Sequence, residues 1–168
     1  MIGALSPCDR AIDMPTPFDP QLVLTRPLMA NLATVTPDGA PRNAPVWFAW
    51  EDSALWMLSD ATSSSAARVI SNPQVAVEIV DYDNEAGVLR HLGLRGEASV
   101  EPMNTTLFRR ILRRYLGPED QQNVWFIKNV ARVEDPAGRL IRLAPSSIFT
   151  NDVSFFRTGP ALALRNAR

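Results

Sequence analysis

The chain has 168 residues, 46% of them hydrophobic and 21% charged, which is enough to bury the core of one ordinary domain. Its formal net charge of −1 leaves no excess of basic residues for a polyanionic backbone, so a nucleic-acid partner is not expected. No apolar run reaches the roughly 18 residues needed to span a bilayer, and we therefore expect a cytoplasmic protein without a membrane partner.

The N-terminal stretch 1–18 predicts an irregular arm. It carries three prolines and no basic segment followed by an apolar one, so a signal peptide is not expected. Cys8, the single cysteine, lies in this arm, and His91 is the single histidine. One cysteine and one histidine cannot supply a metal centre, so we predict no metal site and interpret His91 as structural. We expect one domain over 19–156 and a loose tail over 157–168.

The first predicted element is a short helix over 22–24, which ends before Pro27 because a residue ahead of proline is pushed out of helical geometry. From Leu28 the pattern changes to strands. A turn with proline in its second position and glycine in its fourth separates a strand over 28–35 from a return strand over 43–50. Pro45 lies inside that return strand, so we expect a local gap in its pairing.

A second hairpin leads into a strand over 54–59, and a serine-rich turn then begins a helix over 63–70. The next two strands, over 75–80 and 88–100, show the alternation typical of a sheet with one buried face. Arg90 interrupts the apolar face of the second of these strands. A guanidinium at such a position needs a partner or an opening to solvent.

Two amphipathic helices are expected next, over 105–116 and 119–131, followed by a last strand over 138–143. About six strands in mostly antiparallel succession, with helices at the ends, favour a mainly β, partly closed barrel over an alternating α/β sheet.

The segments LATVTPDGAP, APVWF, LWMLS, a serine-rich turn, NPQVAVEIVD and LRGEASV occur in an order that resembles the pyridoxamine 5′-phosphate oxidase-like family of FMN-binding split barrels. The resemblance covers about residues 20–150 and lies in the succession of segments, not in a single motif. It implies a six-stranded antiparallel Greek-key split β-barrel. It also implies a homodimer, with FMN in a groove that both subunits share.

The resemblance places the cofactor against the return strand, the end of the next strand and the serine-rich turn. Independently of it, a helix start with free N–H groups and small hydroxyls is a plausible anion cradle. The implied cofactor-binding residues are Pro45, Val46, Trp47, Phe48, Met57, Leu58, Ser59, Ser63, Ser64, Ser65 and Arg68.

The sequence departs from the family pattern in the phosphate turn. Ser65 and Ala66 replace the usual basic pair, and Ala44 replaces an arginine often found at the start of the flavin strand. The remaining donors are hydroxyls, helix N–H groups and Arg68. Hydrogen bonds to a charged partner stabilise by about 1.5–3 kcal/mol each, so three or four of them would hold a phosphate.

We therefore predict an FMN-binding protein, a flavin-dependent oxidoreductase that acts on a small molecule. No catalytic side chain is identifiable, because the ring of a flavin carries the electrons itself. Two alternatives on the same fold stay open. One is a deazaflavin-dependent reductase, which would need a basic groove for a longer acidic tail, and the other is a non-catalytic dimer that binds heme or flavin.

Overall fold

The computed structural model describes residues 16–154. Cys8, the rest of the predicted arm up to residue 15 and the predicted tail 157–168 lie outside the described residues. Among residues 16–154, no helix combines the length and the apolar character that a membrane crossing requires.

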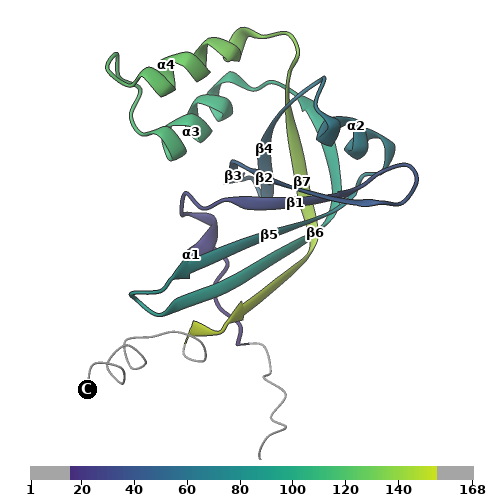
Figure 1. Ribbon diagram of the computed structural model, residues 1–168, viewed down its shortest axis with the longest axis vertical. Coiled ribbons are helices and arrows are strands. Elements are labelled where there is room, and N and C mark those ends of the chain that lie inside the picture. The colour runs from purple at the N-terminus through teal and green to yellow at the C-terminus, as the bar shows by residue number, and fades with distance from the viewer. Residues whose placement is uncertain (1–15, 155–168) are drawn as a thin grey trace, which may run out of the picture.

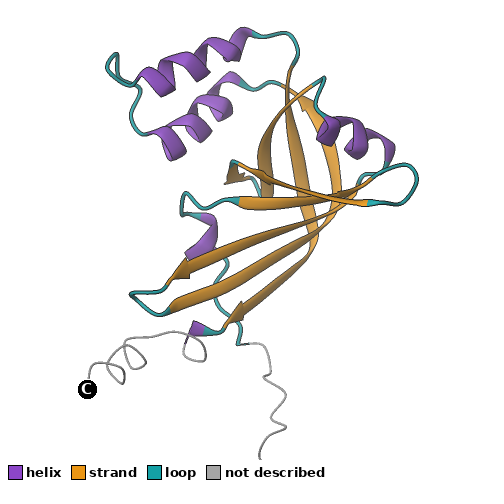
Figure 2. Ribbon diagram, in the orientation of Figure 1, coloured by secondary structure: helices purple, strands orange, loops and turns teal. Residues whose placement is uncertain are grey.

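The described chain is mainly β and forms one seven-stranded antiparallel sheet with helices at its margins (Figures 1 and 2). The strand order is β2-β1-β5-β6-β7-β4-β3. The strands are β1 (Ala30–Val35), β2 (Pro41–Val46), β3 (Phe48–Glu51), β4 (Ala54–Asp60), β5 (Gln74–Asp83), β6 (Val88–Pro102) and β7 (Gly138–Asp152).

The sheet has seven strands where the sequence predicted about six, because the expected return strand 43–50 divides at Trp47. β2 pairs with β1 at one edge of the sheet, and β3 pairs with β4 at the other edge. No ladder joins β2 to β3, so hydrogen bonds do not close the sheet into the predicted six-stranded barrel. The two edge strands are consecutive in the chain and are connected through Trp47 alone.

The last strand is longer than predicted. It was expected to end at Leu143, but β7 continues along β6 as far as Asp152. Pro145 lacks an N–H and would interrupt a regular ladder. A register shift opposite Arg95 and Gly96 leaves Ser146 as an extra residue, and the pairing resumes beyond it.

Within residues 16–154, three of the four α-helices begin at a side-chain cap, and the first helix, whose N-cap is Pro20, does not. Ser63, Asn104 and Asn123 each accept a hydrogen bond from a backbone N–H three residues later. The helices are α1 (Gln21–Leu24), α2 (Ser64–Ser71), α3 (Thr105–Leu116) and α4 (Val124–Val130), with a 3₁₀ turn at Ala131–Glu134. The fourth helix begins at Val124 instead of residue 119, because Asn123 caps it there.

The core lies on the inner face of the curled sheet. Buried side chains from β1, β3, β4, β5, β6 and β7 form its main cluster, which α2 covers with Val69. α3 and α4 lie side by side at one end of the molecule (Figure 1). They bury a second apolar layer, which includes Ile111, Leu112 and Phe126, against β3 and β7.

Candidate functional site

The serine-rich turn forms the entry to α2. The Ser63 hydroxyl accepts from the Ala66 backbone N–H at 3.0 Å and lies 2.7 Å from the hydroxyl of Ser59 at the end of β4. Ser64 is exposed, while Ser63 and Ser65 are half-buried. Ser59, Ser63 and the first turn of α2 therefore lie together, as the sequence predicted for a phosphate-binding turn.

Arg68 is held one turn further along α2. Its Nε donates to the Thr34 hydroxyl at 2.7 Å, and one terminal nitrogen donates to the Ser65 hydroxyl at 3.3 Å. Thr34 is a buried residue of β1, so Arg68 is anchored on the sheet. These bonds use part of the five N–H donors of the guanidinium and leave the others for a ligand.

Arg42 is a basic residue near this place that the sequence reasoning missed. Thr34, which anchors Arg68, is paired with Arg42 across the β1–β2 ladder. Directly paired residues point to the same face of a sheet, so Arg42 lies on the Thr34 side. Arg42 is exposed, and one of its terminal nitrogens donates to the Pro41 carbonyl at 2.9 Å. Counting the register back across the 36–39 turn would have found it.

Arg42 also acts on the neighbouring turn. The pKa of Asp38 lies below its ordinary value, chiefly because the Thr36 hydroxyl donates to its carboxylate, and the charge of Arg42 adds to this effect. Asp38 therefore stays ionised and offsets part of the Arg42 charge.

The predicted flavin strand is divided between surface and core. Pro45 is exposed and Val46 and Trp47 are half-buried, but Phe48 and Met57 are fully buried in the core. As placed, the side chains of Phe48 and Met57 cannot touch a ligand in solvent. The segment meets the end of β4 through one bond, in which the Leu58 N–H donates to the Trp47 carbonyl at 3.4 Å.

Leu58 and Ser59 also line a pocket of about 190 Å³ beneath the α3–α4 helices. Its wall includes apolar Met103 and Phe108 and the charged side chains of Asp60 and Arg132. The pKa of Asp60 lies below its ordinary value, mainly because the Thr62 hydroxyl donates to it. The end of β4 therefore borders both the serine-rich turn and the pocket beneath the helices.

Two adjoining grooves, of about 380 and 360 Å³, run over the outer face of the sheet. Ala33, Ala76 and Arg95 line both of them. His91 and Glu78 lie in the larger groove with 3.2 Å between His91 Nδ1 and the carboxylate. Asn43 of β2 lines the same groove, so the groove reaches the strand that leads into the predicted cofactor segment.

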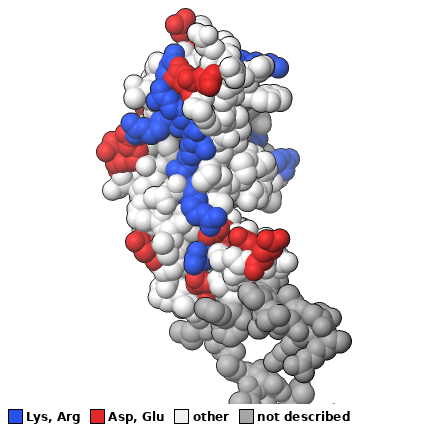
Figure 3. Space-filling model, turned by 90° about the vertical axis from the view of Figure 1, so that its left-hand side faces the viewer, with Lys and Arg blue, Asp and Glu red and all other residues white. Residues whose placement is uncertain are grey.

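The arginines are mostly engaged elsewhere. Basic side chains form a band down one face of the molecule, with acidic side chains beside them (Figure 3). On α3, Arg109 and Arg113 pair with Glu119, and Arg110 pairs with Glu51. The pKa of Glu119 falls below its ordinary value, mainly because Arg113 donates to it.

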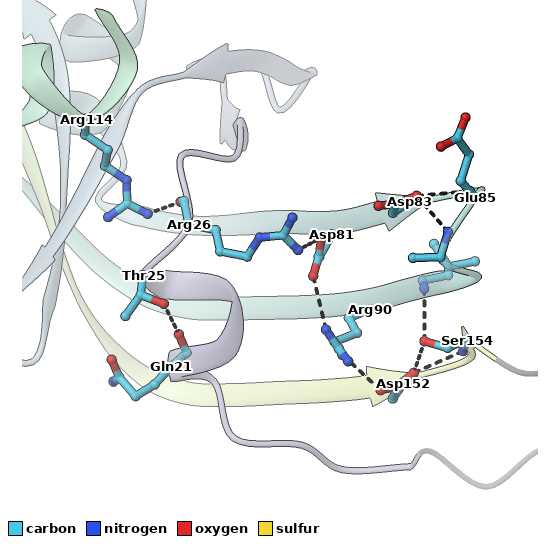
Figure 4. Close-up of polar contacts among 12 residues, drawn as sticks. Gln21, Thr25, Arg26, Asp81, Asp83, Glu85, Arg90, Arg114, Asp152 and Ser154 are labelled. Atoms are coloured by element: carbon cyan, nitrogen blue, oxygen red, sulfur yellow. Dashed lines mark hydrogen bonds and ion pairs between the residues drawn. The ribbon is translucent and has the colours of Figure 1, made fainter. Parts of the chain in front are cut away.

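Arg90, which the sequence predicted to need a partner, has two. It lies 3.3 Å from the Asp81 carboxylate and 3.0 Å from that of Asp152, and Asp81 also accepts from Arg26 (Figure 4). This network joins β5, β6 and β7 and contains none of the predicted cofactor residues. Among residues 16–154, no three His, Cys, Asp or Glu side chains gather as metal ligands would.

Comparison with solved structures finds the same fold in proteins with different descriptions. An F420 reductase is 28% identical, with a TM-score of 0.62 over 80% of this chain and 98% of that one. A conserved hypothetical protein from Mycobacterium tuberculosis is 20% identical, with a TM-score of 0.65 over 82% and 86%. A heme storage protein from Vibrio cholerae is 17% identical, with a TM-score of 0.60 over 78% and 91%.

Among curated proteins, none matches this chain. The family model described as pyridoxamine 5′-phosphate oxidase matches residues 21–151, which include the serine turn, the divided strand and both outer grooves. This range covers most of the 168 residues. The chain therefore belongs to the pyridoxamine 5′-phosphate oxidase family.

Proposed function

We propose that this protein binds FMN and is a flavin-dependent oxidoreductase for a small molecule. The observation that carries the proposal is the position of Arg68, anchored on Thr34 and Ser65 beside the capped start of α2. Family membership, shown over residues 21–151, supports a flavin-related redox function in general.

The donors around α2 suit a phosphate monoester. Ser63 caps the helix, Ser64 is exposed, and Arg68 holds a guanidinium within reach of the same turn. Arg42 lies on β2, on the same face of the sheet as its partner Thr34 of β1. It would supply a second positive charge in place of the basic pair that the sequence lacks. Helix N–H groups and two guanidinium groups together meet the charge and the acceptor count of a phosphate.

The chain would place the ring along 45–48. Pro45 is exposed on an edge strand and cannot donate, and Leu58 fixes the following peptide through the Trp47 carbonyl. A bound flavin would supply two-electron chemistry, and these residues would orient it and keep water from one side. The sheet edges that meet at Trp47 support a split-barrel arrangement.

We further propose that the protein works as a homodimer through the outer face of its sheet. The two grooves have a floor of small side chains, among them Ala33 and Ala76, and the larger one carries both Glu78 and Arg95. A surface with both signs of charge can pair with a second copy of itself across a two-fold axis. Asn43 links this face to the ring segment, so a second copy would lie close to the cofactor.

A deazaflavin is the second candidate cofactor. The F420 reductase shares 28% identity over nearly its whole length, and the missing basic pair is a departure from the FMN pattern. The absorption spectrum of the freshly purified protein separates the two, because the flavin and deazaflavin rings absorb visible light at different wavelengths.

The proposal is tested by titration with FMN and with riboflavin, which lacks the phosphate. Arg68→Ala should weaken FMN binding by about 1.5–3 kcal/mol, roughly 10–150-fold in Kd, and leave riboflavin binding unchanged. Arg42→Ala should act in the same direction. Arg113→Ala, on α3 and paired with Glu119, is the matched control. If the wild-type protein binds neither ligand, the proposed function is wrong.

A further inference from the structure

The joint at Trp47 lies between the two edge ladders of the sheet. β2 ends at Val46 on one edge and β3 begins at Phe48 on the other, so a single residue spans the gap between ladders. The predicted ring segment 45–48 crosses this joint. The Leu58 N–H holds the Trp47 carbonyl from β4, and contacts from outside the sheet add to this bond.

Tyr115, near the end of α3, contacts the residues at this joint. Its hydroxyl donates to the Leu28 carbonyl at 2.6 Å and accepts from the Phe48 N–H at 3.2 Å. Its ring is stacked parallel on the Trp47 indole, with 5.1 Å between centroids and 4° between planes. The same ring meets Phe48 edge-on, with 6.4 Å between centroids. One side chain thus fixes both residues at the joint.

The chemistry of Tyr115 suits this double role. Burial raises the pKa of its phenol above the ordinary value, and the Phe48 N–H and Arg114 offset only part of that rise. The phenol therefore stays protonated and can donate and accept at once.

Arg114, next to Tyr115 on α3, also contacts Phe48. Its guanidinium carbon lies 4.6 Å from the centroid of the Phe48 ring. Its terminal nitrogen donates to the Leu24 carbonyl at 2.7 Å and to the Arg26 carbonyl. Figure 4 shows the second of these bonds. Burial lowers the pKa of Arg114. The end of α3 is thereby tied to the joint and to the chain after α1.

We propose that Tyr115 is a positioning residue for the cofactor, acting through the backbone of Phe48 and the indole of Trp47. This inference rests on the proposed function, because it assumes that 45–48 is the ring segment. Tyr115 is not one of the predicted cofactor-binding residues, and its contacts are with Trp47, Phe48 and Leu28. Tyr115 instead holds the segment 45–48, which the ring would contact. Because the Phe48 N–H already donates to the Tyr115 hydroxyl, the polar edge of the ring would need other hydrogen-bond donors.

Tyr115→Phe tests the inference, because it keeps the stacked ring and removes the hydroxyl. With two hydrogen bonds lost, Kd should rise about 5–20-fold for FMN and for riboflavin alike, since the ring segment and not the phosphate turn is disturbed. The visible circular dichroism of bound FMN should change as well. Arg68→Ala, by contrast, should affect FMN alone.

Two controls separate positioning from loss of stability. Tyr82→Phe changes the other tyrosine, which is 57% exposed, and should alter neither affinity nor spectrum. Asn104→Ala removes the N-cap of α3, so it should lower stability without altering either Kd at a temperature where the variant is folded.

Unchanged Kd values and an unchanged spectrum for folded Tyr115→Phe would overturn the positioning role while leaving flavin binding intact. If Tyr115→Phe does not fold, Arg114→Met takes its place. Arg114→Met removes the guanidinium that contacts the Phe48 ring and leaves every residue of 45–48 unaltered. The Kd values for FMN and for riboflavin should therefore rise, and if both stay unchanged the inference is overturned. A wild type that binds neither FMN nor riboflavin overturns the proposed function and this inference together.

Discussion

At the scale of single residues, Gly96 on β6 is closely surrounded by main-chain atoms of β7. A Cβ on Gly96 would lie 2.9 Å from the Ala144 carbonyl oxygen and 3.0 Å from the Ser146 nitrogen. Both are main-chain atoms at the register shift, and they cannot yield without displacing β7. Gly96→Ala should therefore lower the free energy of unfolding by about 1–3 kcal/mol, as measured by urea denaturation.

Gly93→Ala provides the matched control, three residues earlier on β6. There the nearest atoms to an added Cβ belong to the Phe149 side chain, at 3.8 and 3.9 Å, which is ordinary contact. We expect Gly93→Ala to lower the free energy of unfolding by no more than about 0.5 kcal/mol. Equal losses at the two glycines would contradict the explanation.

Individual site residues were predictable where the cause is local. The Ser63 cap follows from a helix start that the sequence shows directly. The position of Arg42 opposite Thr34 depends on the register of β1 and β2, and the anchoring of Arg68 depends on where α2 packs. Neither arrangement can be predicted from a short stretch of sequence.

Phe48 illustrates a different limit. The sequence placed it beside the cofactor, but Phe48 and Ala49 are both buried, since the core covers one face of β3 and α3 covers the other. Alternation carries no information on a strand that is covered on both sides. Tyr115 was missed for a related reason, because its partners lie 67 and 87 residues away.

At the scale of elements, a charged network ties the segment after α1 to three strands. Asp81 is fully buried on β5 and accepts from Arg26 and Arg90, while Arg90 also reaches Asp152 on β7. Asp81→Asn should lower the free energy of unfolding by about 1.5–3 kcal/mol in a urea titration, because it removes the charged acceptor of both guanidinium groups. Tyr82→Asn next to it, at an exposed position, should cost much less.

The Asp152 end of the network predicts a dependence on pH. Burial alone would raise the pKa of Asp152, but hydrogen bonds from Ser154 and Arg90 outweigh it, so the pKa lies below the ordinary 3.8. A lowered folded-state pKa stabilises the protein above 3.8, and this stabilisation disappears as the pH falls through the lower folded value. Asp152→Asn should thus be less stable than wild type at neutral pH, and the gap should close in acid. A gap that is constant with pH would contradict this.

The elements themselves were largely predictable, because periodicity and caps are local. The starts of α2 and α3 lie at the predicted caps. The end of β7 was not predictable, because Pro145 signals a stop and only the long partner strand β6 lets pairing resume. The division of the return strand at Trp47 likewise depends on which distant strands pair on either side.

At the scale of the whole molecule, the proposed dimer is open to a direct test. Ala76 lies on the floor shared by both outer grooves, so Ala76→Arg should fill the contact and leave a monomer in sedimentation equilibrium. Val124→Arg, at a 71% exposed position on α4, should not change the assembly. A dimer that persists in Ala76→Arg would place the interface elsewhere, and a monomeric wild type would remove it altogether.

The edge strands have one more consequence for how copies meet. β2 presents an open side, yet Pro41 and Pro45 leave gaps in its row of backbone donors, and β3 at the opposite margin has only 4 residues. Neither margin is a good template for a strand of a neighbouring molecule. Fibril growth by strand addition is thereby discouraged at both margins, and a long-lived contact between copies is left to the broad side of the sheet.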